Sequence, residues 1–374
     1  MRITFLLPRY GWHPSGGYSV VYSYAGLLAD RGHEVHVVHP RRLPPGGWPR
    51  PSGFAGRVRR IASRIRDRLM RPHMQWARMD PRVQLSYVSD LSARNIPDAD
   101  VVIATWWSTA ESALALPARK GRRYHLIQGY EVWHGEVDRV HAAWRAPLHK
   151  IFIARWLRDR ALGLGVAPSM TSVIPNAIDP EVFRVLRPVE EREPRVAMLY
   201  ASAPPKGAVP GLRILERAHA SVPALTAVLF GVEQPPKRLP DWITYIRGAR
   251  SEQLAADVYN RAAVYLCPSL SEGWHLPPAE AMACGCALVS SDIGGVSDYA
   301  VEGETALLYP PGNTNAGADR LVELLRDDAM RVALAQRGAE RIAQFSWKRS
   351  ADMLETLLRQ VAEPESPDRA ETAR

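Results

Sequence analysis

Short apolar runs alternate with amphipathic stretches from the start of the chain. Residues 3–7 form an apolar run that ends at a proline, and residues 34–38 form another. Between the two runs, apolar side chains recur at helical spacing before the stop at Gly32: Val20, Val21, Tyr24, Leu27 and Leu28. This order predicts a strand, a helix and a second strand, joined by a right-handed crossover onto a parallel sheet.

The same alternation continues along the chain and restarts after a polar stretch at residues 187–194. Further strands are expected at residues 101–104, 124–127, 150–153, 173–176, 196–200, 227–230, 263–267 and 287–290. Helices are expected at residues 156–162, 211–220, 251–260, 316–325, 329–345 and 347–361. Two successive sets of alternating elements predict an α/β protein of two Rossmann-like, doubly wound domains that face each other across a cleft.

The polar stretch and the closing helix set the expected boundaries. Residues 1–187 are predicted to form the first domain and residues 188–345 the second. Residues 346–362 read as a separate closing helix. Residues 363–374, rich in Glu, Pro and Ala, read as a flexible tail.

Composition narrows the class of protein. The chain has 374 residues, 46% of them hydrophobic, which is enough to form real cores and excludes a wholly disordered protein. No run approaches the roughly 18–20 apolar residues that a membrane-spanning helix needs. The three cysteines, Cys267, Cys284 and Cys286, are too few for a disulfide framework and lack the paired spacing of a zinc site. We therefore expect a soluble, cytoplasmic protein.

The net charge of +9 is concentrated in one segment. Residues 41–80 contain eleven arginines and two acids, so the rest of the chain is neutral. Within it, Val58, Ile61, Ala62, Ile65 and Leu69 fall on one helical face, and Arg57, Arg60, Arg64, Arg68 and Arg71 on the other. Such a helix can lie on an anionic membrane surface or pack its apolar face on the first domain, and both readings stay open. Nucleic-acid binding is disfavoured, because nothing else in the chain supports it.

The segment at residues 271–295 combines features of a ligand site. Pro277-Pro278 fits the start of a helix, so Glu272 should lie on a loop and Glu280 near the first helical turn. The free amides of that turn form an anion site suited to phosphate oxygens. Two carboxylates beside it suit the vicinal hydroxyls of a sugar. The alternative is that each acid merely caps a helix or lies on the surface.

These residues resemble a known signature. The stretch SEGWHLPPAEAMACGCALVSSDIGG is similar to the donor-site pattern of retaining, two-domain (GT-B) glycosyltransferases of the family 4 type. Three other stretches agree with that family: SGGYSVVYSYAGLLADRGHEVHVV, VIPNAIDPEVF and FSWKRSADMLETLL. The stretch HLIQGYEVWHG resembles a bacterial subset involved in polysaccharide or glycolipid assembly. The resemblance implies a GT-B fold whose closing helix returns to the first domain.

The resemblance also implies roles for individual residues. Glu280 should bind the ribose hydroxyls of a nucleotide-diphosphate sugar, and Glu272 the donor sugar near the reacting carbon. Lys206 matches the family's phosphate-binding lysine. Such a cation would stabilise the charge on the departing diphosphate. The remaining donor-binding candidates are Gly16, Gly17, Gly273, Trp274, His275, Leu276 and, for the nucleobase, Ile246 and Arg247.

The chain departs from the family pattern at several positions. Tyr200 and Ala201 stand where an arginine usually precedes the lysine, and His275 stands where a glycine is usual. His275 can narrow the donor pocket or simply pack in the core. Many relatives carry a histidine after the fourth strand of the first domain. Here Gln128 and Glu131 are the candidates for a place near the chemistry.

The implied reaction is transfer of a hexosyl group from a nucleotide-diphosphate sugar to a hydroxyl acceptor, with the anomeric configuration retained. The acceptor is expected to be a glycan or a lipid-linked glycan, with the enzyme peripheral on the inner face of the membrane. No D-x-D motif occurs, so neither a metal nor another cofactor is expected. The alternatives are a nucleotide-sugar epimerase or hydrolase on the same fold, and a non-catalytic basic protein that binds membranes or nucleic acid. A dinucleotide dehydrogenase is disfavoured because no G-x-G-x-x-G follows the first strand.

Overall fold

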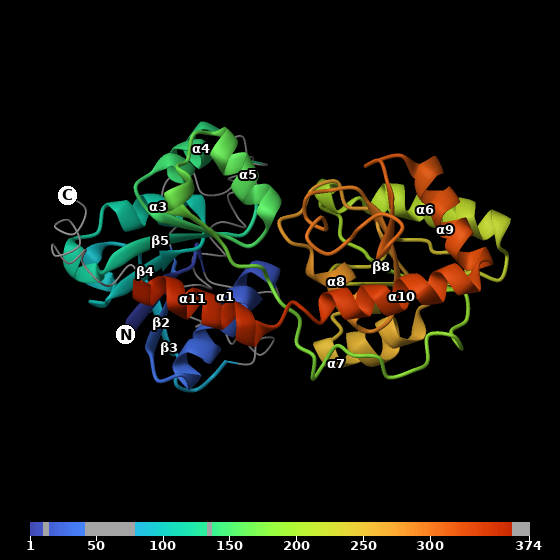
Figure 1. Ribbon diagram of the computed structural model, residues 1–374, viewed down its shortest axis with the longest axis horizontal. Coiled ribbons are helices and arrows are strands. Elements are labelled where there is room, and N and C mark those ends of the chain that lie inside the picture. The colour runs from blue at the N-terminus through green and yellow to red at the C-terminus, as the bar shows by residue number, and fades with distance from the viewer. Residues whose placement is uncertain (10–14, 42–78, 133–136, 361–374) are drawn as a thin grey trace, which may run out of the picture.

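The computed structural model describes residues 1–9, 15–41, 79–132 and 137–360. The predicted basic helix at residues 57–71 lies outside these described ranges, as does the predicted tail. The described chain forms two lobes, each built around a parallel sheet (Figure 1).

The first lobe contains a seven-stranded parallel sheet in the order β3-β2-β1-β4-β5-β6-β7. Its strands are β1 (Arg2–Leu6), β2 (Glu34–Pro40), β3 (Gln84–Val88), β4 (Val101–Ala104), β5 (Arg122–Ile127), β6 (His149–Phe152) and β7 (Thr171–Val173). Its helices are α1 (Gly16–Asp30), α3 (Trp107–Leu114), α4 (Val137–Arg145) and α5 (Arg155–Gly163). The central strands are buried on both faces, which explains their continuous apolar sequence.

The second lobe contains a six-stranded parallel sheet in the order β10-β9-β8-β11-β12-β13. Its strands are β8 (Arg195–Leu199), β9 (Thr226–Gly231), β10 (Ile243–Arg247), β11 (Val264–Cys267), β12 (Ala287–Ser291) and β13 (Ala306–Tyr309). Its helices include α6 (Ala208–Ser221), α7 (Ser251–Gln253), α8 (Leu276–Ala283), α9 (Thr314–Arg326) and α10 (Asp328–Ile342).

Both sheets have the doubly wound order, in which the first strand of each domain lies between the second and the fourth. In such sheets, ligands bind beyond the carboxyl ends of the strands at the point where the order reverses. That point lies between β1 and β4 in the first sheet and between β8 and β11 in the second. The predicted α/β fold of two doubly wound domains is therefore confirmed.

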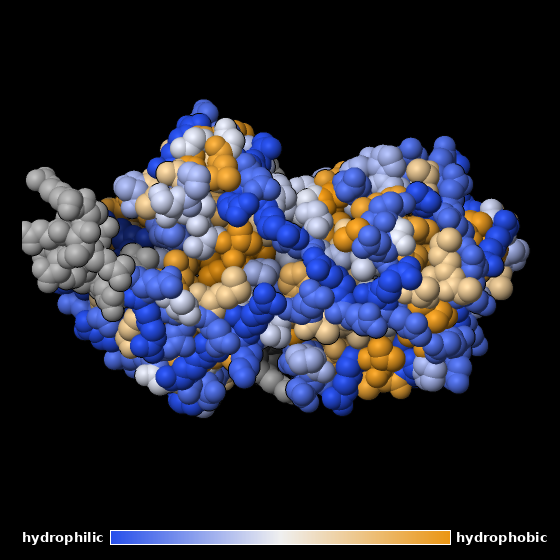
Figure 2. Space-filling model, viewed as in Figure 1, coloured by the Kyte–Doolittle hydropathy of each residue, from blue (hydrophilic) through white to orange (hydrophobic). Residues whose placement is uncertain are grey.

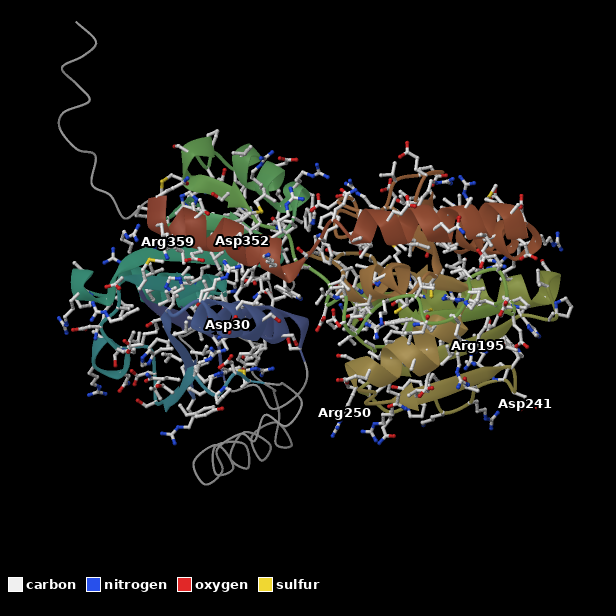
Figure 3. The ribbon with its side chains drawn as sticks, turned by 60° about the horizontal axis from the view of Figure 1, so that its bottom comes forward. Asp30, Arg195, Asp241, Arg250, Asp352 and Arg359 are labelled. Atoms are coloured by element: carbon white, nitrogen blue, oxygen red, sulfur yellow. The ribbon has the colours of Figure 1, made fainter. Side chains whose placement is uncertain are left out.

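The closing helix α11 (Trp347–Gln360) returns to the first domain, as predicted. It packs against α1, and Glu355 on α11 bonds to Arg31 at 2.9 Å and to His33 at 3.0 Å. Figure 3 shows Asp352 and Arg359 of this helix on the same lobe as Asp30 of α1. In the part of the chain that the structure describes, no helix is long and apolar enough to cross a membrane.

The chain crosses between the domains twice, and the two crossings lie side by side. The Ile178 amide donates to the Phe345 carbonyl at 3.1 Å, and Ile178 pairs with Ser346 in a parallel bridge. Beyond Ile178 the chain already packs on the second domain, where the Leu186 amide donates to the Asn260 side chain at 2.7 Å. The first crossing therefore lies earlier than the predicted boundary after residue 187.

Apolar side chains from both faces of each sheet form the core. One cluster of buried residues fills the second sheet and helices α6, α9 and α10, and a larger cluster extends from the first domain to α8. The face of the molecule in Figure 2 is largely hydrophilic, with apolar residues scattered over both lobes. The core thus accounts for the apolar runs that the sequence shows.

Two predicted elements differ from the structure. The strand expected at residues 173–176 is β7, Thr171–Val173, which shares only Val173 with the prediction. The helix expected at residues 251–260 is a short α-helical turn followed by a π-helical turn at Leu254–Val258 and a 3₁₀ turn at Tyr259–Arg261. The wider π turn changes the direction of the side chains that follow it. It directs Tyr259 into the core, where it is fully buried.

Candidate functional site

Lys206 and Glu272 meet at the carboxyl edge of the second sheet. Lys206 follows β8, and Glu272 follows the adjacent strand β11, so the two come from the strands on either side of the switch point. The Lys206 Nζ atom lies 2.8 Å from Oε1 and 2.9 Å from Oε2 of Glu272. The side chain of Glu272 is only 11% exposed, against 32% for Lys206. The candidate cation and the candidate sugar-binding carboxylate thus form one ion pair.

The surroundings of Glu272 keep it ionised. Burial raises the pKa of the Glu272 carboxyl, but the neighbouring His275 and Lys206 outweigh that effect and hold this pKa below its usual value. His275 itself is buried, and burial lowers its pKa to about 4. Its Nδ1 atom lies 3.3 Å from the Cys267 sulfur. His275 is therefore a packed histidine, and its Nε2 atom lies 3.4 Å from Oε1 of Glu272.

Helix α8 begins beside this pair. Leu276 is its first residue and the two prolines follow, so the helix starts one residue earlier than the Pro-Pro pair alone suggests. Glu280 lies on the second turn and accepts a hydrogen bond of 3.0 Å from the hydroxyl of Tyr259. Burial raises the pKa of Glu280 to about 7, although the Tyr259 hydrogen bond opposes the rise. Glu280 therefore titrates near neutral pH.

The first residues of α1 in the first domain, Gly16 and Gly17, face helix α8. A Cβ atom added to Gly16 would lie 3.6 Å from the Leu276 side chain, and one added to Gly17 would lie 3.5 Å from that of Gln128. The Gln128 amide nitrogen also donates to the Gly17 carbonyl at 3.1 Å. Gln128 follows β5, so the carboxyl edge of the first sheet supplies this side of the site.

The two domains touch at Gly273. A Cβ atom at this position would lie 1.9 Å from the Gln128 carbonyl oxygen, so only glycine fits here. Trp156, on α5 of the first domain, donates from Nε1 to the Gly273 carbonyl at 2.7 Å. Next to it, Arg155 pairs with Asp298 at 2.8 Å. Five predicted site residues therefore lie together at the domain interface: Gly16, Gly17, Gln128, Gly273 and Leu276.

A second glycine, Gly295, allows close packing of the backbone against the side chain of Glu272. A Cβ atom at Gly295 would lie 2.4 Å from the Cβ atom of Glu272. The Gly295 carbonyl also accepts a hydrogen bond from the His275 amide at 2.9 Å. The turn at residues 292–295, which ends the signature stretch, thus fixes the position of the loop that carries the Glu272 carboxylate.

Three other candidates lie elsewhere in or around the site. The Trp274 ring is buried against Tyr299 and Phe345, so only its backbone is placed to meet a ligand. Ile246 and Arg247 end strand β10, at the same carboxyl edge as Lys206 but two strands away from β8. That position suits the far end of an elongated ligand.

Glu131 is buried and holds a helix terminus. Its Oε2 atom accepts a hydrogen bond from the Trp107 amide at 3.2 Å, at the first residue of α3. Burial raises the pKa of Glu131 well above its usual value, which favours the neutral acid. Its contact in the structure is therefore with a helix of its own domain.

Sequence reasoning missed Trp156 and Tyr259, which fix Gly273 and Glu280. Both were visible only as apolar positions of expected helices, and their partners lie 117 and 21 residues away in sequence. Nothing in the described residues places a second cation where Tyr200 replaces the family's usual arginine. The Tyr200 ring packs edge-on against Tyr245. Within the described ranges, no group of three His, Cys, Asp or Glu side chains is arranged to hold a metal ion.

The arrangement is suited to binding an anionic, hydroxylated ligand. An ammonium group has three N–H donors, and the bonds to Glu272 use two of those of Lys206. The first turn of α8 adds the amide of Leu276 and the positive end of a helix dipole; Pro277 and Pro278 carry no N–H, and the His275 amide bonds to Gly295. Two carboxylates can accept hydrogen bonds from hydroxyl groups: Glu272, which is ionised at neutral pH, and Glu280, whose pKa is about 7.

Most of the second domain matches a known family of enzymes. Residues 201–327 match the family model described as "Glycosyl transferases group 1". A phosphatidyl-myo-inositol mannosyltransferase of Mycolicibacterium smegmatis is 26% identical over 93% of this chain and 90% of its own length. A D-inositol 3-phosphate glycosyltransferase of Corynebacterium urealyticum is 33% identical, but the match covers only 32% of this chain and 28% of that protein.

Solved structures show the same fold. HepE of Anabaena in complex with UDP superposes with a TM-score of 0.72 at 14% identity, over 96% of this chain and all of that one. Sucrose-phosphate synthase from Thermosynechococcus elongatus superposes with a TM-score of 0.70 at 19% identity, over 96% of this chain and 99% of that one. The GT-B fold and the resemblance to glycosyltransferases are thereby confirmed.

Proposed function

Since the second domain is a glycosyltransferase domain of group 1 and the whole chain has the GT-B fold, we propose that this protein is a retaining hexosyltransferase. Its donor is a nucleotide-diphosphate sugar, and its acceptor is a hydroxyl group of a glycan or lipid-linked glycan. The observation that carries the proposal is the Lys206–Glu272 pair at the switch point of the second sheet, beside the first turn of α8. The anionic membrane surface proposed as a partner would be bound through residues 57–71.

Departure of the nucleoside diphosphate creates negative charge that the protein must stabilise. Lys206 supplies a fixed cation, and the start of α8 supplies the Leu276 amide and the positive end of the helix dipole. The ion pair with Glu272 holds the lysine in position before the donor arrives, so little reorganisation is needed during the reaction. We propose that these groups suffice without a required metal ion or other cofactor.

The two carboxylates orient the donor. Glu272 is ionised and close to Lys206, so it is placed to bind hydroxyls of the sugar that is attached to the diphosphate. Glu280 lies further along α8 and accepts hydroxyls of the ribose when ionised. Ile246 and Arg247, at the end of β10, are placed to contact the nucleobase.

The acceptor enters from the first domain. Gly17, Gln128 and the backbone of Gly273 meet where the two domains touch, and this junction borders the sugar end of the donor. In the described part of the first domain, Glu131 is buried at the start of α3 and its raised pKa favours the neutral acid, which makes it a poor nucleophile. We therefore favour retention by a same-face route, in which the departing phosphate takes the acceptor proton, over a covalent intermediate on Glu131.

The central test replaces the cation. Lys206→Ala should lower kcat by a factor of about 10²–10³, because it removes a charge aimed at the leaving group. Lys237→Ala, an exposed lysine of the same domain, is the matched control and should retain full activity. A panel of UDP-, GDP- and TDP-sugars in a thermal-shift assay first identifies the donor. Full activity of the Lys206→Ala variant would exclude the assigned site.

Incubation with donor alone separates the proposed function from its alternatives. A transferase leaves the donor largely intact until an acceptor is added, whereas a hydrolase releases free sugar and an epimerase changes the sugar on the nucleotide. Nuclear magnetic resonance of the anomeric proton in the product then reports retention or inversion. Rapid consumption of the donor without an acceptor would overturn the transferase assignment.

A further inference from the structure

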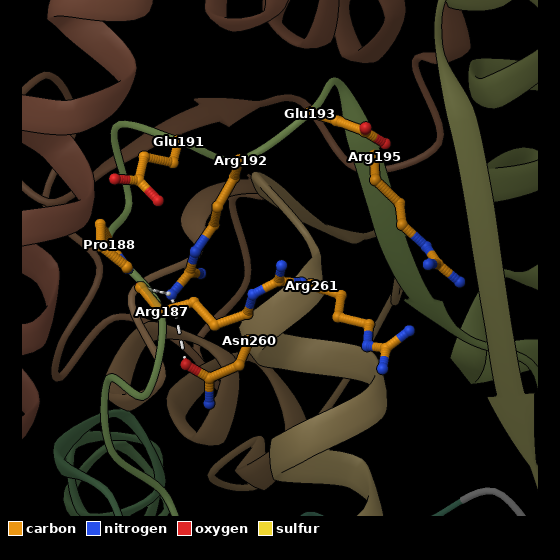
Figure 4. A pocket seen from close by; sticks show the side chains of 8 residues that line it. All are labelled: Arg187, Pro188, Glu191, Arg192, Glu193, Arg195, Asn260 and Arg261. Carbon is orange, nitrogen blue, oxygen red and sulfur yellow. Dashed lines mark hydrogen bonds between the residues drawn. The ribbon is translucent and has the colours of Figure 1, made fainter.

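A cavity of about 200 Å³ lies on the side of the second domain opposite the donor site. It is formed by the chain that enters the second domain and by the 3₁₀ turn at Tyr259–Arg261. Arg195, at the amino end of β8, lines it, whereas the donor site lies at the carboxyl end of the same strand. Figure 4 shows the guanidinium groups that surround this space: Arg187, Arg192, Arg195 and Arg261.

Among the residues that the structure describes, no acid forms an ion pair with the buried member of this group, Arg192. Arg192 is only 8% exposed. Its Nη1 and Nη2 atoms bond to neutral acceptors: the carbonyls of Arg187, Tyr259, Ala262 and Cys284 and the side-chain oxygen of Asn260. A buried cation is costly unless an anion compensates it. Burial accordingly lowers the pKa of Arg192.

The other arginines add to the same positive field. No hydrogen bond or ion pair to a side chain holds Arg187 or Arg195 within the described chain, and the Nε atom of Arg195 is buried without a partner. Arg261 is exposed and has one distant contact, 3.7 Å, with Asp257. Burial and the like charge of Arg261 lower the pKa of Arg195, and the charge of Glu193 opposes this fall only in part.

Two acids also line the cavity, and they do not cancel this charge. Glu191 and Glu193 are exposed, and in the part of the chain that the structure describes no ion pair joins either to an arginine of the cavity. Four guanidinium groups against two carboxylates leave a net positive lining. Arginine donates bidentate hydrogen bonds that match the oxygens of a phosphoryl group.

We propose that this arginine cavity is a second ligand site, which binds a phosphoryl group. Its volume admits inorganic phosphate or a small phosphomonoester and is too small for a nucleotide sugar, since pockets for drug-sized ligands measure about 300–1,000 Å³. The buried guanidinium of Arg192 provides a fixed positive charge beside the cavity. The side chains of Arg187, Arg195 and Arg261 would donate hydrogen bonds to the bound anion.

The position of the cavity connects it to the donor site through one helix. Arg192 donates from Nη2 to the carbonyl of Cys284 at 2.7 Å, and Cys284 caps the carboxyl end of α8. The opposite end of α8 forms the donor site. The site proposed here does not depend on the proposed function, because it rests on the cavity and its charges alone.

Isothermal titration of the full chain with inorganic phosphate and, separately, with glycerol 2-phosphate tests the proposal. Ionic strength is held constant with sodium chloride, so that general charge screening is the same in each titration. Arg195→Gln combined with Arg261→Gln should raise the Kd for phosphate at least tenfold. The control, Arg213→Gln combined with Arg217→Gln, removes two exposed arginines of α6 and should leave the Kd unchanged.

The donor site is excluded by a third variant. Lys206→Ala should keep phosphate binding, because Lys206 lies at the other edge of the sheet. Loss of binding in Lys206→Ala with retention in the Arg195/Arg261 variant would overturn the proposal, as would the absence of any phosphate binding to the wild-type chain. Tighter binding of glycerol 2-phosphate than of phosphate identifies a phosphomonoester as the ligand, and the reverse identifies free phosphate.

Discussion

The two sides of the candidate site differ in charge. The second domain contributes Lys206 and Glu272 as an ion pair, whereas Gly17 and Gln128 of the first domain contribute uncharged groups; the Arg155–Asp298 pair crosses the interface nearby. In the described part of the first domain, Glu131 is buried, and its raised pKa favours the neutral form. The proposed function therefore assigns the diphosphate and its leaving charge to the second domain and the hydroxyl acceptor to the first.

The difference between the two domains is tested most strongly by replacing one carboxylate in each: Glu272 in the second domain and Glu131 in the first. Glu272→Gln should lower kcat by about 10²-fold, because it removes a charge that holds Lys206 and binds the donor sugar. Glu131→Gln should change kcat less than about threefold, because an amide oxygen still accepts the hydrogen bond of the Trp107 amide. Steady-state kinetics measures both. A larger loss in Glu131→Gln than in Glu272→Gln would assign the chemistry to the first domain.

The contact between the two domains is tested by a substitution at Gly273. Gly273→Ala should lower kcat/KM by about tenfold or more, because the added Cβ atom would meet the Gln128 carbonyl and force the domains apart. Gly163→Ala, at the end of α5 where nothing lies within 4 Å of the added atom, is the control and should be neutral. Small-angle scattering should show a more open shape for Gly273→Ala. Wild-type kinetics in this variant would mean that the domains need not touch for catalysis.

The pH dependence of donor binding sharpens the role of Glu280. Its pKa of about 7 lies above its ordinary value, so the carboxylate that accepts hydroxyls becomes populated only as pH rises through 7. The donor KM should therefore fall about tenfold between pH 6 and pH 8. Glu280→Gln should abolish this dependence. Tyr259→Phe should move the midpoint to higher pH, because the ionised form loses a hydrogen bond. A flat KM profile in the wild-type protein would exclude the assignment.

The smallest effect is expected where α11 returns to the first domain. Glu355→Gln should lower stability by about 1 kcal/mol, or Tm by about 2 °C, since it weakens contacts with Arg31 and His33. The pKa of Glu355 is lowered to about 2, mainly by its hydrogen bond to Arg359. This contribution is therefore present at neutral pH and is lost as pH falls from about 4.5 towards 2.

A matched substitution controls for general loss of surface charge. Glu340→Gln, an exposed acid on α10 with no ion pair in the described chain, should leave Tm unchanged. Equal Tm values for both variants would show that the contacts of Glu355 add nothing measurable to stability.

Most of the fold could be predicted from the sequence because the central strands are buried on both faces. Their apolar runs, such as residues 101–104, matched the observed strands closely. The strands β3, β10 and β13 were missed, since each is short and lies at or next to a sheet edge, where the apolar signal is weaker. The turn that carries Tyr259 was read as a helix, because periodicity does not distinguish a π turn from an α turn.

The candidate site also contains residues that the sequence predicted and residues that it did not. Glu272 and Glu280 stand in one continuous segment, so local spacing was enough to single them out. Trp156, which binds the Gly273 carbonyl from the other domain, gave no local signal, because its role depends on how two separately folded sheets meet. His275 was predicted either to narrow the donor pocket or to pack in the core, and the structure buries it beside Glu272.

The paired crossings at Ile178 and Ser346 constrain how the enzyme can move. We expect two connections that lie side by side and share a hydrogen bond to act as one narrow hinge, which favours rotation of the domains over sliding. Such a rotation would move Gly273 away from Gln128. Under the proposed function, the donor would enter and the nucleoside diphosphate would leave by that same movement.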